Sequence, residues 1–197
     1  MQKLQISKLY GYMVHNADDF LGSQGAHIAD ALRLLKEQGL VCKVGVSVYR
    51  NEQLDAITRF FIPDLIQVPV NVMDQRLIKN GALKKMKDLG VEIHARSAYL
   101  QGLLLMPLSL VPAYFSPILP ILCRWHQCAQ SQQLSPAQAA IAFVSEISEI
   151  DKIIIGVENT QQFDEIINAE SAKCGFDANG LSCDDVNYIE PSNWKMK

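Results

Sequence analysis

Five short apolar runs recur along this chain, and together they constrain its fold more than any other feature. Each run ends in a polar residue or a glycine, and the segments between them have the spacing of amphipathic helices; the runs cover residues 10–15, 41–47, 65–71, 91–97 and 152–156. Alternating strands and helices are typical of a parallel sheet, in which functional groups gather at the carboxyl ends of the strands. We therefore expect these residues to lie on or near one rim of the sheet: His15, Ser47, Gln67, Ser97 and Gly156.

Glycine and proline mark the limits of the helical segments. Gly39 and Gly90 each follow an apolar stripe and precede a strand-like run, which predicts a left-handed helix cap at both positions. The pairs Ser116-Pro117 and Ser135-Pro136 each place a capping residue before a proline, which predicts the first turns of two helices. We interpret the residues after 173 as an irregular tail.

The composition suits one folded domain with an appendage. The chain has 197 residues, of which 49% are hydrophobic, enough to bury a sizeable core. A net charge of -3 with scattered lysine and arginine disfavours nucleic-acid binding. The first residues lack the charged region and apolar core of a secretory signal, so we expect a cytoplasmic protein.

Residues 97–123 carry no charge, which raises the question of a membrane span. Four prolines interrupt this stretch and argue against a continuous helix: Pro107, Pro112, Pro117 and Pro120. We interpret it as a long, partly buried loop that leads into a helix, and expect no membrane partner.

The cysteines and the strand ends exclude several kinds of site. Five cysteines are an odd number without disulfide-like spacing, so we expect free thiols. Cys123 and His126 are too few ligands for a structural zinc site, and we predict no metal. Glycine-rich dinucleotide and P-loop motifs are absent, although the spacing of the units alone leaves an open doubly wound sheet and part of an eight-stranded barrel as alternatives. Gln67 interrupts an apolar run, so its side chain should be buried and need a partner.

Several segments carry a resemblance when they are taken in order. They are residues 12–15 (Tyr-Met-Val-His), 43–47 (Lys-Val-Gly-Val-Ser), 64–67 (Asp-Leu-Ile-Gln), 96–104, 154–162 and 191–194. In this order they resemble the fourth to eighth strands and the closing segment of the aldo/keto reductases, which are NAD(P)H-dependent oxidoreductases with a (β/α)8 barrel. The resemblance covers essentially the whole chain.

The resemblance implies a partial TIM-type barrel, strands four to eight with their helices, over residues 1–173, followed by a carboxyl-terminal tail over residues 174–197. A complete barrel takes about 250 residues, and the first three βα units of the family have no counterpart here. Such a barrel would expose strand edges at residues 9–14 and 152–156, neither of which has more than one charge. We therefore expect the chain to form a homo-oligomer through these edges, to pair with a supplied amino-terminal fragment, or to aggregate.

The resemblance also implies roles for individual residues. His15 matches the histidine that orients the substrate oxygen. The cofactor, NADP(H) or NAD(H), would be held by nine residues: Ser47, Gln67, Arg96, Ser97, Leu100, Gln101, Gly102, Gly156 and Gln162. Among these, Ser47 and Gln67 would bind the nicotinamide carboxamide, Arg96 would stack on the ring, the backbone of 100–102 would hold the pyrophosphate, and Gln162 would reach the adenosine end. Glu158 lies where a basic residue often meets the 2′-phosphate, which leaves the choice between the two cofactors open.

The leading function hypothesis is an aldo/keto reductase-like oxidoreductase that acts on small carbonyl substrates but is truncated. The family's catalytic Asp, Tyr and Lys lie on its first three units, so we expect weak or no activity from this chain alone. The alternative is a non-catalytic barrel remnant that acts through self-association or partner binding. A third hypothesis, an unrelated barrel lyase or isomerase, is disfavoured because no lysine or paired carboxylate ends a strand.

Overall fold

The computed structural model describes residues 2–169 and 175–195. Its strands are β1 (Leu9–Val14), β2 (Val41–Ser47), β3 (Leu65–Pro69), β4 (Glu92–Arg96) and β5 (Lys152–Ile153). Its α-helices are α1 (Ala17–Leu21), α2 (Gly25–Glu37), α3 (Asn51–Thr58), α4 (Arg76–Lys79), α5 (Ala82–Asp88), α6 (Leu119–Ser131), α7 (Pro136–Ser145), α8 (Thr160–Ala169) and α9 (Val186–Ile189). Its short 3-10 helices are η1 (Gln2–Leu4), η2 (Leu100–Leu105), η3 (Leu108–Leu110), η4 (Ala113–Ile118), η5 (Asn179–Leu181) and η6 (Pro191–Asn193).

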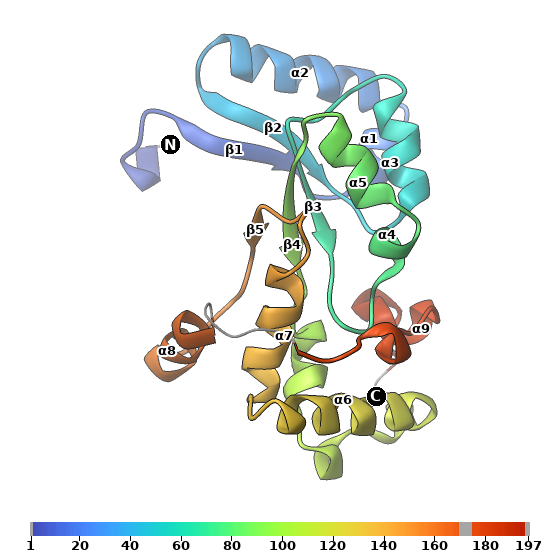
Figure 1. The fold of residues 1–197 in the computed structure, drawn as a ribbon. Coiled ribbons are helices and arrows are strands. Elements are labelled where there is room, and N and C mark those ends of the chain that lie inside the picture. The colour runs from blue at the N-terminus through green and yellow to red at the C-terminus, as the bar shows by residue number, and fades with distance from the viewer. Residues whose placement is uncertain (1, 170–174, 196–197) are drawn as a thin grey trace. The chain divides into compact units, whose positions relative to one another are not determined.

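The strands form one sheet in the order β1-β2-β3-β4-β5, which confirms the predicted α/β class with a parallel sheet (Figure 1). β1 and β2 are parallel with Val14 opposite Val46, and β2 and β3 are parallel with Ser47 opposite Gln67. Each predicted apolar run contains a strand. The fifth strand is much shorter than predicted, since only Lys152 and Ile153 have strand geometry. The next residue keeps one ladder bond, from the Ile154 N–H to the Ala95 carbonyl at 2.7 Å.

The chain divides into two compact units. Unit 1 comprises the residues up to Val68 together with Leu77–His94, and unit 2 comprises Pro69–Arg76 together with the residues from Ala95 onward. Two strands, β3 and β4, pass from one unit into the other, since each spans a boundary.

Unit 1 buries one face of its strands under helices. Val46 on β2 and Ile66 on β3 are register partners and are fully buried. α2 packs against β2, and its Leu32 is also buried. β2 and β3 approach so closely that a Cβ on Gly45 would lie 2.0 Å from the Leu65 carbonyl oxygen. Only glycine fits this contact, because even alanine would force the two backbones apart.

The helix caps of unit 1 follow the sequence prediction. Gly39 and Gly90 have φ values of 71° and 77°, in the left-handed region where a side chain is disfavoured. Each ends a helix, α2 and α5, directly before a strand. These two glycines therefore allow the chain to reverse with almost no loop.

The other face of the strands in unit 1 carries a charged network centred on Glu92. The Tyr10 hydroxyl donates to Glu92 Oε2 at 2.6 Å, and His94 Nε2 lies 2.5 Å from Glu92 Oε1. The Lys43 ammonium pairs with the same carboxylate, and this hydrogen bond raises the pKa of Lys43. Lys43 thus supplies a countercharge to Glu92 within the network.

In unit 2, the chain continues after β4 with short turns rather than with a regular helix. Residues 100–118 form the 3-10 helices η2, η3 and η4, in agreement with the predicted proline-rich loop. Trp125 on α6 is fully buried and its Nε1–H donates to the Leu104 carbonyl at 2.8 Å, which holds this loop against the helix. The predicted helix start at Ser116 is wrong. α6 begins at Leu119, and Pro120 takes the first-turn position that was predicted for Pro117.

The second predicted helix start is confirmed. Ser135 caps α7, its hydroxyl accepts the Gln138 N–H at 3.2 Å, and Gln138 Oε1 accepts the Ser135 N–H at 2.9 Å. Most of α7 is apolar and buried, and the helix packs against α8, η2 and β5. This packing fixes the elements that surround the cavity described below.

The tail, predicted as irregular, contains three short helices: η5, α9 and η6. The prediction began at residue 174, which lies outside the described residues. Buried polar contacts tie the tail to the segment after β3. The Cys183 N–H donates to the Met73 carbonyl at 2.8 Å, and Gln75 Nε2 donates to the Ala178 carbonyl at 2.9 Å.

An arginine-centred triad adds charge to this attachment. Arg76 donates from Nε and Nη2 to the two oxygens of Asp74, at 2.8 and 2.9 Å, and from Nη1 to Glu190 Oε1 at 2.8 Å. The Asp74 and Glu190 residues are each only 2% exposed. Burial raises the pKa of Asp74, and Arg76 opposes this rise through its hydrogen bonds. The two carboxylates also raise the pKa of Arg76, which stays charged.

Candidate cofactor site

In unit 1, two of the predicted site residues lie at the carboxyl ends of neighbouring strands, and a third lies beside them in the middle of β3. His15 directly follows β1, Ser47 ends β2, and Gln67 lies opposite Ser47 on β3. The Val48 N–H donates to the Gln67 carbonyl at 2.9 Å, which extends the pairing past the end of β2. The structure therefore brings together the three residues that the sequence assigned to this part of the rim.

The environments of these three residues differ. Ser47 is 4% exposed, whereas His15 is exposed. Gln67 is half-buried rather than buried, and its side-chain amide makes no hydrogen bond within the described part of the chain. An amide with both donor and acceptor capacity is thus available to a ligand at this end of the strands. Among the described residues, none supplies the hydrogen-bond partner that was predicted for Gln67.

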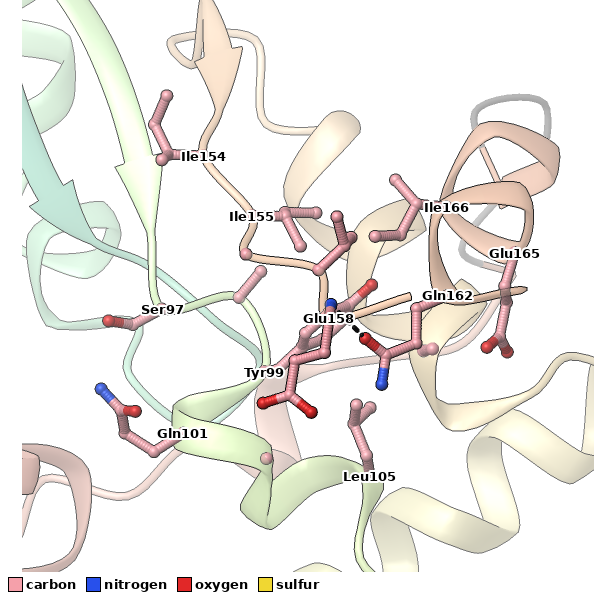
Figure 2. Close-up of a pocket in the computed structure, with 15 residues that line it drawn as sticks. Ser97, Tyr99, Gln101, Leu105, Ile154, Ile155, Glu158, Gln162, Glu165 and Ile166 are labelled. Carbon is pink, nitrogen blue, oxygen red and sulfur yellow. Dashed lines mark hydrogen bonds between the residues drawn. The ribbon is translucent and has the colours of Figure 1, made fainter. Parts of the chain in front are cut away.

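In unit 2, a cavity of about 600 Å³ lies between the turn after β4 and the region from β5 to α8 (Figure 2). This volume is within the range of small-molecule and cofactor sites, roughly 300–1,000 Å³. The cavity is lined by Ser97, Ala98, Tyr99, Gln101, Gly102, Leu105, Ala137, Ile154, Ile155, Gly156, Val157, Glu158, Gln162, Glu165 and Ile166. Five of the nine predicted cofactor residues are in this set: Ser97, Gln101, Gly102, Gly156 and Gln162.

Two predicted residues of unit 2 do not line the cavity. Leu100 is fully buried, and its N–H donates to the Ser97 carbonyl at 2.9 Å, within the turn. Arg96 is half-buried and donates from Nη1 to Ser97 Oγ at 3.3 Å. Leu100 thus bonds within the turn, and Arg96 contacts a residue of the cavity wall.

The turn after β4 has an unusual backbone. Ser97, Leu100 and Gln101 have φ values of 62°, 46° and 54°, and Gly102 follows with 86°. Residues other than glycine adopt this left-handed region rarely, at a cost of order 1–3 kcal/mol each, and such residues cluster at ligand sites. The sequence signals only Gly102 in this group, because nothing in a serine, a leucine or a glutamine indicates a positive φ.

The loop before α8 is held by its own polar groups. The Glu158 N–H donates to Gln162 Oε1 at 2.8 Å, which is the dashed line in Figure 2. The Gln162 N–H in turn donates to Asn159 Oδ1 at 2.9 Å, as in a helix cap. Gln162 therefore closes the loop, and its amide nitrogen remains as the group that can reach a ligand.

Sequence reasoning missed two titratable residues of the cavity. Tyr99 comes from the turn after β4 and Glu165 from α8, so only the fold brings them together. Burial raises the pKa of Tyr99 to about 12, and the Glu165 carboxylate adds to this rise. Glu165 also accepts a hydrogen bond from the Ser135 hydroxyl. No periodicity or motif in the sequence points to either residue.

The described cavity lining is acidic. It includes two carboxylates, Glu158 and Glu165, and no lysine, arginine or histidine. Elsewhere, the described residues contain no cluster of three or more potential metal ligands. Among the described helices, none has the length and apolar character needed to cross a membrane.

Comparison with known proteins agrees with this arrangement. A sequence model of the Aldo/keto reductase family matches residues 1–178. The chain belongs to the aldo/keto reductase family. No curated protein matched the chain.

Solved aldo/keto reductases share the fold at low sequence identity. The holo form of an aldo-keto reductase from Bacillus halodurans matches with a TM-score of 0.72 and 17% identity, covering 91% of this chain and 61% of that chain. Its apo form gives 0.74 and 17%, covering 91% and 62%. A thermostable aldo-keto reductase in complex with the inhibitor epalrestat gives 0.64 and 18%, covering 91% and 60%. The chain thus spans about three-fifths of the length of these family members.

Proposed function

We propose that this chain binds a nicotinamide dinucleotide and belongs functionally with the NAD(P)-dependent oxidoreductases of its family. The observation that carries the proposal is the cofactor-sized cavity of unit 2, whose wall contains five residues that the sequence assigned to the cofactor. The free amide of Gln67 and the buried Ser47 add a second group of polar residues, at the strand ends of unit 1. Each group therefore offers polar contacts to a ligand with amide and hydroxyl groups.

We propose further that β1–β5 correspond to strands four to eight of the family's barrel. Consecutive strands are neighbours in the sheet, as they are in a barrel wall. The coverage of about three-fifths of the solved relatives supports the same assignment. On this assignment, residues 1–173 are the barrel portion and 174–197 the tail.

Each predicted residue has a role in this proposal. Ser47 and Gln67 hydrogen-bond the nicotinamide carboxamide, while Arg96 stacks against the ring. Ser97 and the backbone of 100–102 hold the pyrophosphate, and Gly156 and Gln162 lie beside the adenosine end. His15 donates a hydrogen bond to the carbonyl oxygen of a small substrate. When bound, the cofactor would supply a hydride to the substrate carbon.

The same proposal predicts weak or no turnover by these 197 residues. None of the described strand ends presents a tyrosine with a neighbouring lysine and aspartate, the set that supplies the proton in this family. General acid catalysis typically contributes about 10²–10⁴-fold. We expect carbonyl reduction by this chain to be slower by at least this factor than reduction by a family member with the complete set, even where the cofactor binds.

Fluorescence titration of NADH and NADPH tests the binding proposal directly. We expect weak but saturable binding that Gln67→Ala reduces about fivefold or more, since a hydrogen bond of about 1 kcal/mol is lost. Gln130→Ala is the matched control, because Gln130 is exposed on α6 and does not line the cavity. No binding of either nucleotide at millimolar concentration would contradict the proposal. Equal loss in both variants would remove Gln67 from the site.

A second candidate function is self-association through β1. β1 ends the strand order, and Tyr10 and Tyr12 are 50% and 48% exposed on it. The strand has no charged residue to oppose addition of another strand. Light scattering at micromolar concentration tests this candidate, which predicts a dimer that Tyr12→Lys converts to monomer. A monomeric unmodified chain would exclude it.

A further inference from the structure

The charge of the cavity in unit 2 distinguishes between the two nicotinamide cofactors. Its two titratable carboxylates, Glu158 and Glu165, have no basic residue beside them among the described lining residues. A site for a phosphate monoester ordinarily supplies arginine or lysine, because the group carries a charge of about -1.5 to -2 at neutral pH. The cavity supplies the opposite charge.

The two carboxylates differ in how they are held. Glu165 lies on α8 and is hydrogen-bonded by the Ser135 hydroxyl, which fixes it at the cavity wall. Glu158 is exposed in the loop between β5 and α8, and its backbone N–H donates to Gln162 Oε1. Its carboxylate makes no hydrogen bond to any of the described residues. Its carboxylate is therefore free to accept hydrogen bonds from a ligand, on a backbone that is already held in place (Figure 2).

A ribose diol and a ribose 2′-phosphate respond oppositely to such a carboxylate. The diol has two O–H donors, and charge-assisted bonds of this kind are about twice as strong as neutral ones. A phosphate beside the carboxylate is repelled, because two negative charges are brought close together. Acidic residues play the first role in dinucleotide folds generally, where they bind the 2′-hydroxyl.

We propose that this cavity selects NAD(H) over NADP(H), with Glu158 as the residue that determines the choice. The inference rests on the proposed function, since it takes the cavity as the adenosine subsite. Glu165 contributes a second negative charge at the same wall. Selection acts through repulsion of the 2′-phosphate as well as through attraction of the free diol, so both terms favour the same cofactor.

The test compares NADH and NADPH binding to the full chain by fluorescence titration. We expect NADH to bind at least tenfold more tightly than NADPH at low salt. The ratio should narrow when the salt is raised from about 50 mM to 500 mM, because the repulsion between exposed charges is screened. Glu158→Gln should reduce the ratio to about threefold or less, mainly by tightening NADPH, and Glu158→Lys should favour NADPH.

Asp164→Asn is the matched control for these variants. It removes one negative charge from an exposed position on α8, the helix that follows the Glu158 loop, without touching the cavity lining, and it should leave the ratio within twofold. Equal changes in Glu158→Gln and Asp164→Asn would overturn the assignment of Glu158. NADPH binding as tight as NADH binding in the unmodified chain would overturn the inference but leave the proposed function standing. Failure of both nucleotides to bind would overturn the proposed function, and the inference with it.

Discussion

Unit 2 contains two pairs of carboxylates that differ in their countercharge. Asp74 and Glu190 are almost completely buried, and Arg76 hydrogen-bonds both. Glu158 and Glu165 line a cavity with no described basic residue beside them. Buried charges require a partner within the protein, whereas charges at a cavity can be completed by a ligand. The first pair is therefore part of the fold, and the second is available for recognition.

The largest effect expected from this comparison follows the loss of Arg76. Arg76→Met removes the guanidinium that hydrogen-bonds two buried carboxylates, and the free energy of unfolding should fall by about 3–5 kcal/mol. Urea denaturation measures the loss. Lys84→Met is the control, since the Lys84 and Asp88 side chains are 72% and 64% exposed and their pair contributes about 0–1 kcal/mol. Equal losses in the two variants would show that Arg76 contributes no more to stability than an exposed lysine does.

A smaller effect is expected at alkaline pH from the tyrosine of the cavity. The pKa of Tyr99 is raised from 10.0 to about 12, so the folded state favours the protonated phenol. This contribution to stability is complete below pH 10.0 and is lost as the pH rises through about 12. The melting temperature of Tyr99→Phe should therefore fall less than that of the unmodified chain over this interval.

Tyr12→Phe serves as the control for this pH dependence. Tyr12 is 48% exposed on β1, so its replacement should leave the alkaline loss of stability unchanged. The same alkaline loss in Tyr99→Phe and in the unmodified chain would show that the phenol is not sheltered. In that case this part of the cavity wall would be open to solvent in the folded chain.

The smallest effect is expected for the carboxylate that is assigned to recognition. Glu158→Gln should change the free energy of unfolding by no more than about 0.5 kcal/mol. The side chain is exposed, and its carboxylate makes no hydrogen bond to any of the described residues. Thermal and urea denaturation check this expectation. A loss above about 1 kcal/mol would mean that Glu158 stabilises the loop, and the distinction between the two carboxylate pairs would weaken.

Local features of the fold could be predicted from the sequence. The caps at Gly39 and Gly90 were predictable because a positive φ selects glycine, and α7 because Ser135, Pro136 and Gln138 form a local cap. The length of β5 was not, since the isoleucine run 153–155 favours a strand that pairing with β4 does not extend. The start of α6 was missed because two prolines competed for the same role.

Residues of the candidate site could be proposed from the sequence where a strand-like run ended or where a segment resembled the family. Gly156 ends such a run and Gln162 lies in such a segment, and both line the cavity. Tyr99 and Glu165 were not, because a polar residue on a helix or in a turn gives no sign of the element it will face. The Arg76–Glu190 bond joins residues 114 positions apart, beyond the reach of any local pattern.

The Arg76 triad has a consequence for where this protein can be cut. The family match ends at residue 178, yet Glu190, which supplies one of the two countercharges of Arg76, lies twelve residues beyond that limit. Residues beyond the matched range are thus coupled to the segment after β3 through this ion pair. A protease that removes these residues, or a shortened gene that omits them, would take away one of the two carboxylates that bind Arg76. The segment after β3 would then lose stability along with the residues that were removed.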